Sequence, residues 1–104
     1  MSNSELKQMR VLCIILKNFI KYHKLYYFKH CYNNLLDIID IIDSDLSNEK
    51  KSKLIIEKYK NLYPPHNGLD ECYVFDNNFE RMKEINAPFG EAQDKAWNIM
   101  RKYV

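Results

Sequence analysis

The sequence predicts a single all-α domain, residues 1–104, with four or five helices around one modest core. Three observations favour this fold class. A length of 104 residues is enough for one domain. Both glycines and all three prolines lie at or beyond residue 64, so the first 63 residues contain neither helix breaker. Apolar residues also recur at the spacing of three and four positions that places them on one side of a helix.

The first helix is expected to begin near Asn3. Ser2 and Glu5 have the spacing of a capping box, in which each side chain accepts a hydrogen bond from a free backbone N–H group. A helical projection then places six apolar residues on one side: Met9, Leu12, Cys13, Leu16, Phe19 and Ile20. Val11 and Ile14 fall near the polar side, so either another element covers them or they form an exposed contact patch.

The second helix is expected over about residues 24–43. Its apolar side, which includes Leu25 and Tyr32, is broad enough for the middle of a bundle. No breaker separates it from the first helix, so the two could also form one long bent helix. Ser47 or Asn48 is expected to cap a third helix that runs to about Leu62. The proline pair that begins at Pro64 then ends it, because proline has no backbone N–H donor.

The C-terminal part is predicted to begin with an irregular linker over residues 63–76. Its end, Cys-Tyr-Val-Phe at 72–75, favours extended backbone and is compatible with one very short strand.

A fourth helix is expected to open at Asp76 or Asn77. Pro88 and Gly90 are expected to interrupt it, so that a final helix begins at about Glu91.

The cysteines indicate a reduced, cytoplasmic location. Cys13, Cys31 and Cys72 are odd in number, form no Cys-x-x-Cys pair and follow no secretory signal. The most apolar run, residues 11–16, is far shorter than the roughly 20 residues that cross a bilayer. We therefore expect no membrane segment.

The net charge of +2 hides a strong segregation along the chain. Residues 1–36 carry six basic residues and one acid, residues 37–49 carry five acids and no base, and residues 50–60 carry five lysines and one acid. Local fields steer association, so each segment is a separate candidate for partner binding.

The segment D-I-I-D-I-I-D-S-D places four carboxylates in nine positions: Asp37, Asp40, Asp43 and Asp45. Carboxylates that converge can bind Mg²⁺. At about 100° per residue, however, Asp43 is turned by about 240° from Asp37 on a helix. The set converges only if the helix ends or bends there, so we expect no metal site.

Three explanations remain for this acidic segment. It is the solvated edge of a helix, it pairs with lysines of the same chain, or it docks a basic protein surface. Carboxylates at the C-terminal end of a helix oppose the helix dipole, which favours a reason beyond solubility. Lys50, Lys51 and Lys53 are the expected partners if that reason is internal.

No catalytic residue and no cofactor are expected. Cysteine catalysis needs a thiolate beside an imidazole, but His30 and Cys31 are neighbours that point about 100° apart on a helix. His23 and His30 lack a third ligand for zinc. No glycine-rich phosphate loop is present.

Cations and aromatic residues alternate in one stretch: Lys17, Lys21, Tyr22, Lys24, Tyr26, Tyr27 and Lys29. Lysines that neutralise phosphates and tyrosines that stack on bases are typical of nucleic-acid binding. This stretch therefore predicts an alternative function, a small nucleic-acid-binding regulator of phage or plasmid origin.

Residues 62–86 resemble a segment of small bacterial proteins of uncharacterised function. The shared features are a proline pair, Gly-Leu, an aromatic strand-like stretch, an acid, and a helix opening with Phe-Glu: Pro64, Pro65, Gly68, Leu69, Tyr73, Phe75, Asp76, Phe79 and Glu80. Trp97 is also similar. The resemblance implies a bacterial or mobile-element origin and no enzymatic activity, and it transfers no functional residue. In type, a small lysine-rich helical protein of this kind is similar to the immunity proteins that accompany bacterial toxins.

The predicted function is therefore a non-catalytic protein-binding module, an immunity protein that neutralises a toxin with a basic cleft. Charge complementarity would speed the encounter, and a few buried anchors would supply affinity. The expected partner-binding residues are a steering surface of four carboxylates with two anchors on the same polar edge of the second helix: Asp37, Asp40, Asp43 and Asp45, with Tyr26 and Asn33. A homo-oligomer that buries the broad apolar faces of the first two helices is a third possibility.

Overall fold

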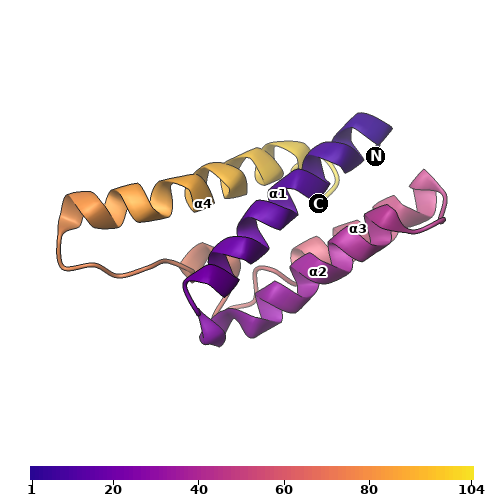
Figure 1. The fold of residues 1–104 in the computed structure, drawn as a ribbon. Coiled ribbons are helices and arrows are strands. Elements are labelled where there is room, and N and C mark those ends of the chain that lie inside the picture. The colour runs from indigo at the N-terminus through magenta and orange to yellow at the C-terminus, as the bar shows by residue number, and fades with distance from the viewer.

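Four α-helices make up the fold in the computed structural model, which describes all 104 residues (Figure 1). They are α1 (Asn3–Tyr22), α2 (Lys29–Asp43), α3 (Asn48–Lys60) and α4 (Phe79–Met100). Two single turns of 3-10 helix, η1 (Tyr26–Phe28) and η2 (Leu69–Glu71), lie in the connections. The prediction of an all-α domain is confirmed. Residues 72–75 form no strand, because no second extended segment pairs with them.

The helices pack in a row. α1 contacts both α4 and α2, and α2 in turn contacts α3. The first half of α4 extends beyond the other helices, so the molecule is elongated, with extents of 47 × 22 × 22 Å (Figure 1). Cys31, Leu35 and Ile38 of α2 are completely buried, as expected for a helix between two others. None of the four helices is both long and apolar enough to cross a membrane.

α1 begins as the sequence predicts. The backbone N–H of Glu5 donates to the Ser2 hydroxyl over 3.1 Å, and the Ser2 N–H donates to the Glu5 carboxylate over 2.9 Å. The predicted apolar side is buried, apart from Phe19, which is half-buried. Ile14 packs partly against the core, whereas Val11 is 57% exposed, so no element covers it.

A tight corner separates α1 from α2, so the two are not one bent helix. The N–H of Leu25 donates to the Ile20 carbonyl over 3.0 Å, and the N–H of Lys24 donates to the Lys21 carbonyl over 3.2 Å. These two bonds define a Schellman motif, which ends a helix by placing one residue in the left-handed conformation. Here that residue is Lys24, with φ of 54°. Because of this corner, α2 begins at Lys29 instead of near residue 24.

The cap of α3 agrees with the sequence, since the Ser47 hydroxyl accepts from the Lys50 N–H. The expected end near Leu62 is two residues beyond the last helical residue, Lys60.

α4 differs from the prediction in two ways. Its cap is Asn78, whose side chain accepts from the Arg81 N–H, while the Asp76 carboxylate accepts from the Asn78 N–H. It also continues through Pro88 to Met100, so the predicted break near Gly90 and the separate fifth helix are wrong.

Burial explains why the proline does not break α4. A proline inside a helix forfeits one backbone hydrogen bond and crowds the preceding turn. Immediately after Pro88, Phe89 is buried and stacks on Phe19 of α1 with ring centroids 4.5 Å apart. Ala92, Ala96 and Met100 are buried along the same side of α4. A continuous helix keeps all four on the core, and this packing offsets the missing bond.

Candidate functional site

The four aspartates of the acidic segment do not converge. Asp43 accepts two hydrogen bonds from Arg10 of α1, Nε to Oδ1 over 2.7 Å and Nη2 to Oδ2 over 3.0 Å. Asp37 pairs instead with Lys58 of α3, at 3.1 Å. The two carboxylates therefore face opposite neighbours of α2. No three His, Cys, Asp or Glu side chains lie close enough to hold one metal ion.

Basic residues of the same chain pair with two of the four aspartates. The hydrogen bonds from Arg10 hold the pKa of Asp43 below its usual range. Lys51 does not pair with a carboxylate; its Nζ donates to the Ile42 carbonyl over 2.7 Å, which satisfies a free acceptor at the end of α2. Of the predicted internal partners, only Lys51 lies against this segment. The dipole argument for an external partner is correspondingly weaker.

Asp40 and Asp45 form the remainder of the predicted acidic surface. Both are exposed, and neither takes part in an ion pair. They are therefore the two carboxylates of the segment that a basic partner could neutralise without competing with an internal contact.

The cysteines are buried and weakly acidic. Burial raises the pKa of the Cys13 thiol to about 12, and burial with the nearby Asp70 charge raises that of Cys31 to about 11. Burial and the nearby Cys31 raise the pKa of the Cys72 thiol to about 12. These thiols stay protonated at neutral pH, where a nucleophilic cysteine needs to be a thiolate.

His30 has a structural contact. Its Nε2 lies 3.0 Å from the Asn61 carbonyl, one of the acceptors left free where α3 ends. With Nε2 protonated, the imidazole joins the start of α2 to the end of α3.

A groove of about 550 Å³ lies at the corner between α1 and α2, and we call it the corner groove. Its lining residues are Ile20, Lys21, Lys24, Leu25, Tyr26, Lys29, Tyr32 and Asn33. None is acidic, and none of the three lysines forms an ion pair. The groove therefore combines an apolar and aromatic wall with uncompensated positive charge.

The two predicted anchors belong to this corner groove. Tyr26 and Asn33 both line it. Tyr26 lies in η1, before α2 begins, so it does not follow the helical register that would align it with the aspartates. The structure thus places the anchors of the protein-binding hypothesis beside three of the four lysines of the nucleic-acid hypothesis; the fourth, Lys17, does not line the groove.

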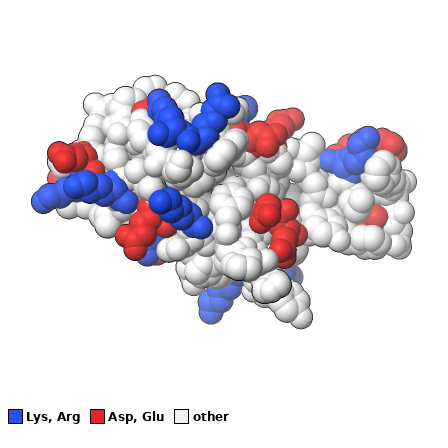
Figure 2. Space-filling model, turned by 180° about the vertical axis from the view of Figure 1, so that it is seen from behind, with Lys and Arg blue, Asp and Glu red and all other residues white.

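Three tyrosines of the connection between α1 and α2 and of the end of α1 are strongly exposed, and one of them, Tyr26, lines the groove. Tyr22, Tyr26 and Tyr27 are exposed by 80, 79 and 85%. Sequence reasoning missed Tyr32 and Leu25, which the helical projection assigns to the core; both are only half-buried and reach the groove. Figure 2 shows basic and acidic side chains interspersed over one face of the molecule.

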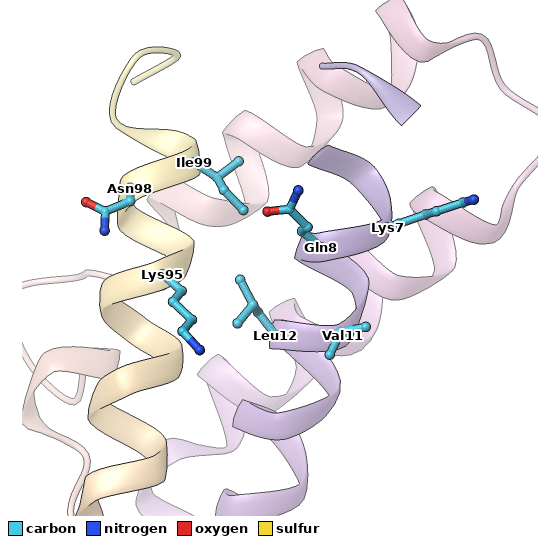
Figure 3. Close-up of a pocket in the computed structure, with 7 residues that line it drawn as sticks. All are labelled: Lys7, Gln8, Val11, Leu12, Lys95, Asn98 and Ile99. Carbon is cyan, nitrogen blue, oxygen red and sulfur yellow. The ribbon is translucent and has the colours of Figure 1, made fainter. Parts of the chain in front are cut away.

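A second groove, of about 530 Å³, separates α1 from the last turns of α4. Figure 3 shows Ile99 and Lys95 of α4 across a gap from Gln8 and Leu12 of α1. The exposed Val11 lies at its edge. This groove is mainly apolar and holds no group of reactive side chains, so we regard it as a surface feature of the α1–α4 contact.

Comparisons of this chain with protein-family models, with curated proteins and with solved structures found no match.

Proposed function

We propose that this protein is a small, non-catalytic module that binds single-stranded nucleic acid in the corner groove. The observation that carries the proposal is the set of three lysines, free of any carboxylate partner, around an aromatic-lined groove. Lysine ammonium groups neutralise phosphates, and exposed tyrosines offer flat faces on which any base can stack. Binding of this kind requires no cofactor.

The corner groove is better suited to a ligand than the acidic segment is. A partner that docked on all four aspartates would compete with Arg10 for Asp43 and with Lys58 for Asp37, which leaves only two free carboxylates. A phosphate entering the corner groove displaces only water from Lys21, Lys24 and Lys29. An unpaired cation therefore contributes more to binding than a carboxylate that must first leave an internal partner.

The number of lysines sets the expected salt dependence of binding. Each phosphate contact to a single strand contributes about −0.7 to the slope of log K against log salt concentration, so three contacts predict a slope of about −2. Binding should be modest and tolerant of sequence, because stacking and phosphate contacts do not read base identity.

Fluorescence anisotropy with a labelled oligothymidine of about 12 nucleotides at low salt tests the proposal. The wild type should bind, and Lys21→Glu and Lys29→Glu should each weaken binding strongly by placing a carboxylate in the groove. Lys50→Glu is the matched control, since Lys50 is exposed on α3 and forms no ion pair. Equal losses in all three variants would indicate a general charge effect and would contradict a site in the corner groove.

A second candidate is the immunity-type function, in which the protein neutralises a toxin with a basic cleft. The observation that favours it is the pair of exposed, unpaired carboxylates at Asp40 and Asp45. Either function would place the protein in the cytoplasm, where its thiols remain reduced.

A binding test with the protein encoded in the neighbouring reading frame distinguishes the two candidate functions. If that protein is a toxin, it should co-purify with the wild type and lose affinity for the Asp40→Lys, Asp45→Lys double variant. Unchanged affinity in the double variant would remove the acidic surface from consideration.

A further inference from the structure

Lys24 adopts a backbone conformation that lysine disfavours. Its φ is 54°, in the left-handed region, where the Cβ of an L-residue approaches the following carbonyl. The position is the one at which helices ending in a Schellman motif usually carry glycine. Lysine at this position therefore lowers the stability of the corner relative to glycine.

No side-chain hydrogen bond or ion pair of Lys24 offsets this cost. The backbone N–H of Lys24 donates to Lys21 and its carbonyl accepts from the Tyr26 N–H over 3.0 Å, and glycine would keep both bonds. The side chain is exposed and forms no ion pair. What the side chain does provide is one wall of the corner groove, between Lys21 on α1 and Lys29 on α2. Strained backbone conformations of this kind cluster at ligand-binding and active sites.

We infer that Lys24 is a phosphate contact for a single strand that places an unpaired base in the corner groove. This inference rests on the proposed function and adds to it a role for the left-handed Lys24 and the entry of one base into the groove. The groove volume of about 550 Å³ is ample for one base. Ile20 and Leu25 supply an apolar floor, and Tyr26 and Tyr32 supply aromatic surface. A base in a duplex is paired and stacked, so only an unpaired base can enter.

Substitution at Lys24 separates the backbone effect from the charge effect. Lys24→Gly removes both the strain and the ammonium group, whereas Lys24→Gln removes the ammonium and keeps a side chain in the left-handed conformation. Asn67→Gly is the matched control, because Asn67 is the other non-glycine residue with positive φ, 58°, and lies in the linker outside the groove. Thermal unfolding and anisotropy with a labelled single strand, competed by the same sequence as a duplex, are measured for each variant.

The inference predicts opposite changes in the two measurements for Lys24→Gly. Its melting temperature should rise by about 4 °C, while its affinity for the single strand falls about fivefold at low salt. Lys24→Gln should show the loss of affinity without the gain in melting temperature. Asn67→Gly should bind as the wild type does, with a smaller gain in melting temperature because asparagine tolerates the left-handed region. Duplex should compete at least tenfold less well than the single strand.

Three results would overturn the inference. Unchanged affinity in Lys24→Gly, with Lys21→Glu and Lys29→Glu still impaired, would leave the proposed function intact and remove Lys24 from the site. A melting temperature that does not rise in Lys24→Gly would refute the claim that the conformation costs stability. Equal competition by the duplex would refute the unpaired base. If the wild type binds no oligonucleotide at low salt, the proposed function itself fails.

Discussion

Arg10 and Asp43 form a bidentate ion pair that joins the middle of α1 to the last residue of α2. Because of this pair, Asp43 contacts another helix of the same chain, whereas the sequence offers it as one of four aspartates that could dock a partner. Both side chains are nearly half exposed, so the attraction between them is screened by solvent and salt.

The first prediction concerns this pair. A double-mutant cycle of Arg10→Ala and Asp43→Ala, followed by urea unfolding, should give a favourable coupling that shrinks as salt is added. Because Arg10 lowers the pKa of Asp43, the coupling is present above the unfolded-state pKa of aspartate and is lost as pH falls through the folded value. A coupling of zero at low salt and neutral pH would show that the pair contributes nothing to stability.

Glu5 is predicted to stabilise the fold in a pH-dependent way. Its carboxylate accepts hydrogen bonds from Lys102 Nζ over 2.6 Å and from the Tyr103 hydroxyl over 2.7 Å, in addition to the Ser2 N–H. The contact with Lys102, followed by the Ser2 and Tyr103 bonds, lowers the pKa of Glu5 to about 2. A lowered folded-state pKa gives stability that is complete above the unfolded value and is lost as pH falls through the folded one.

The test is the difference in free energy of unfolding between the wild type and Glu5→Gln, measured across pH. Glu5→Gln should be less stable at pH 7, and the difference should shrink from about pH 4.5 down to about pH 2. A difference that stays constant over this range would mean that the Glu5 charge is not what stabilises the chain ends.

Asn86 is predicted to hold the linker against α4. Its side chain accepts from the Val74 N–H over 2.7 Å and donates to the Val74 carbonyl over 2.8 Å. Asn86→Ala should cost about 1–3 kcal/mol, because it leaves both half-buried backbone groups without these partners. Hydrogen exchange at Val74 should accelerate in this variant. Asn98→Ala, an exposed substitution on the same helix, should do neither.

Pro88 is predicted to lower stability in α4. Pro88→Ala would restore a donor for the preceding turn, so the free energy of unfolding should increase by about 1–3 kcal/mol with helical content unchanged. Pro65→Ala is the control, since Pro65 lies in the irregular linker and has no helical bond to regain. A loss of stability in Pro88→Ala would show that the proline positions Phe89 against Phe19.

Local signals predicted much of the fold. The capping residues Ser2 and Ser47, and the apolar periodicity of α1 and α2, depend on residues three or four apart, and the structure agrees with them. The continuity of α4 could not be predicted in this way. A proline penalty is visible in the sequence, but the burial of Phe89 against α1 that outweighs it is a contact between distant segments.

The candidate site was harder to predict for the same reason. Asp43 and its partner Arg10 are 33 positions apart, and no local pattern connects them. The helical projection aligns Tyr26 with the aspartates only if the helix begins near residue 24, whereas α2 begins at Lys29. The left-handed turn at Lys24 instead redirects the chain, so that Tyr26 lies with Lys21 and Lys29. This corner could not be predicted from the sequence, because lysine and not glycine occupies the left-handed position.

The salt dependence of wild-type binding to a single-stranded oligonucleotide tests the central claim most directly. We expect measurable affinity at about 50 mM salt and a slope of about −2, which is a loss of roughly fifteenfold on raising salt to about 200 mM. No binding at low salt, or an affinity that does not change with salt, would contradict a corner groove whose three lysines hold phosphates.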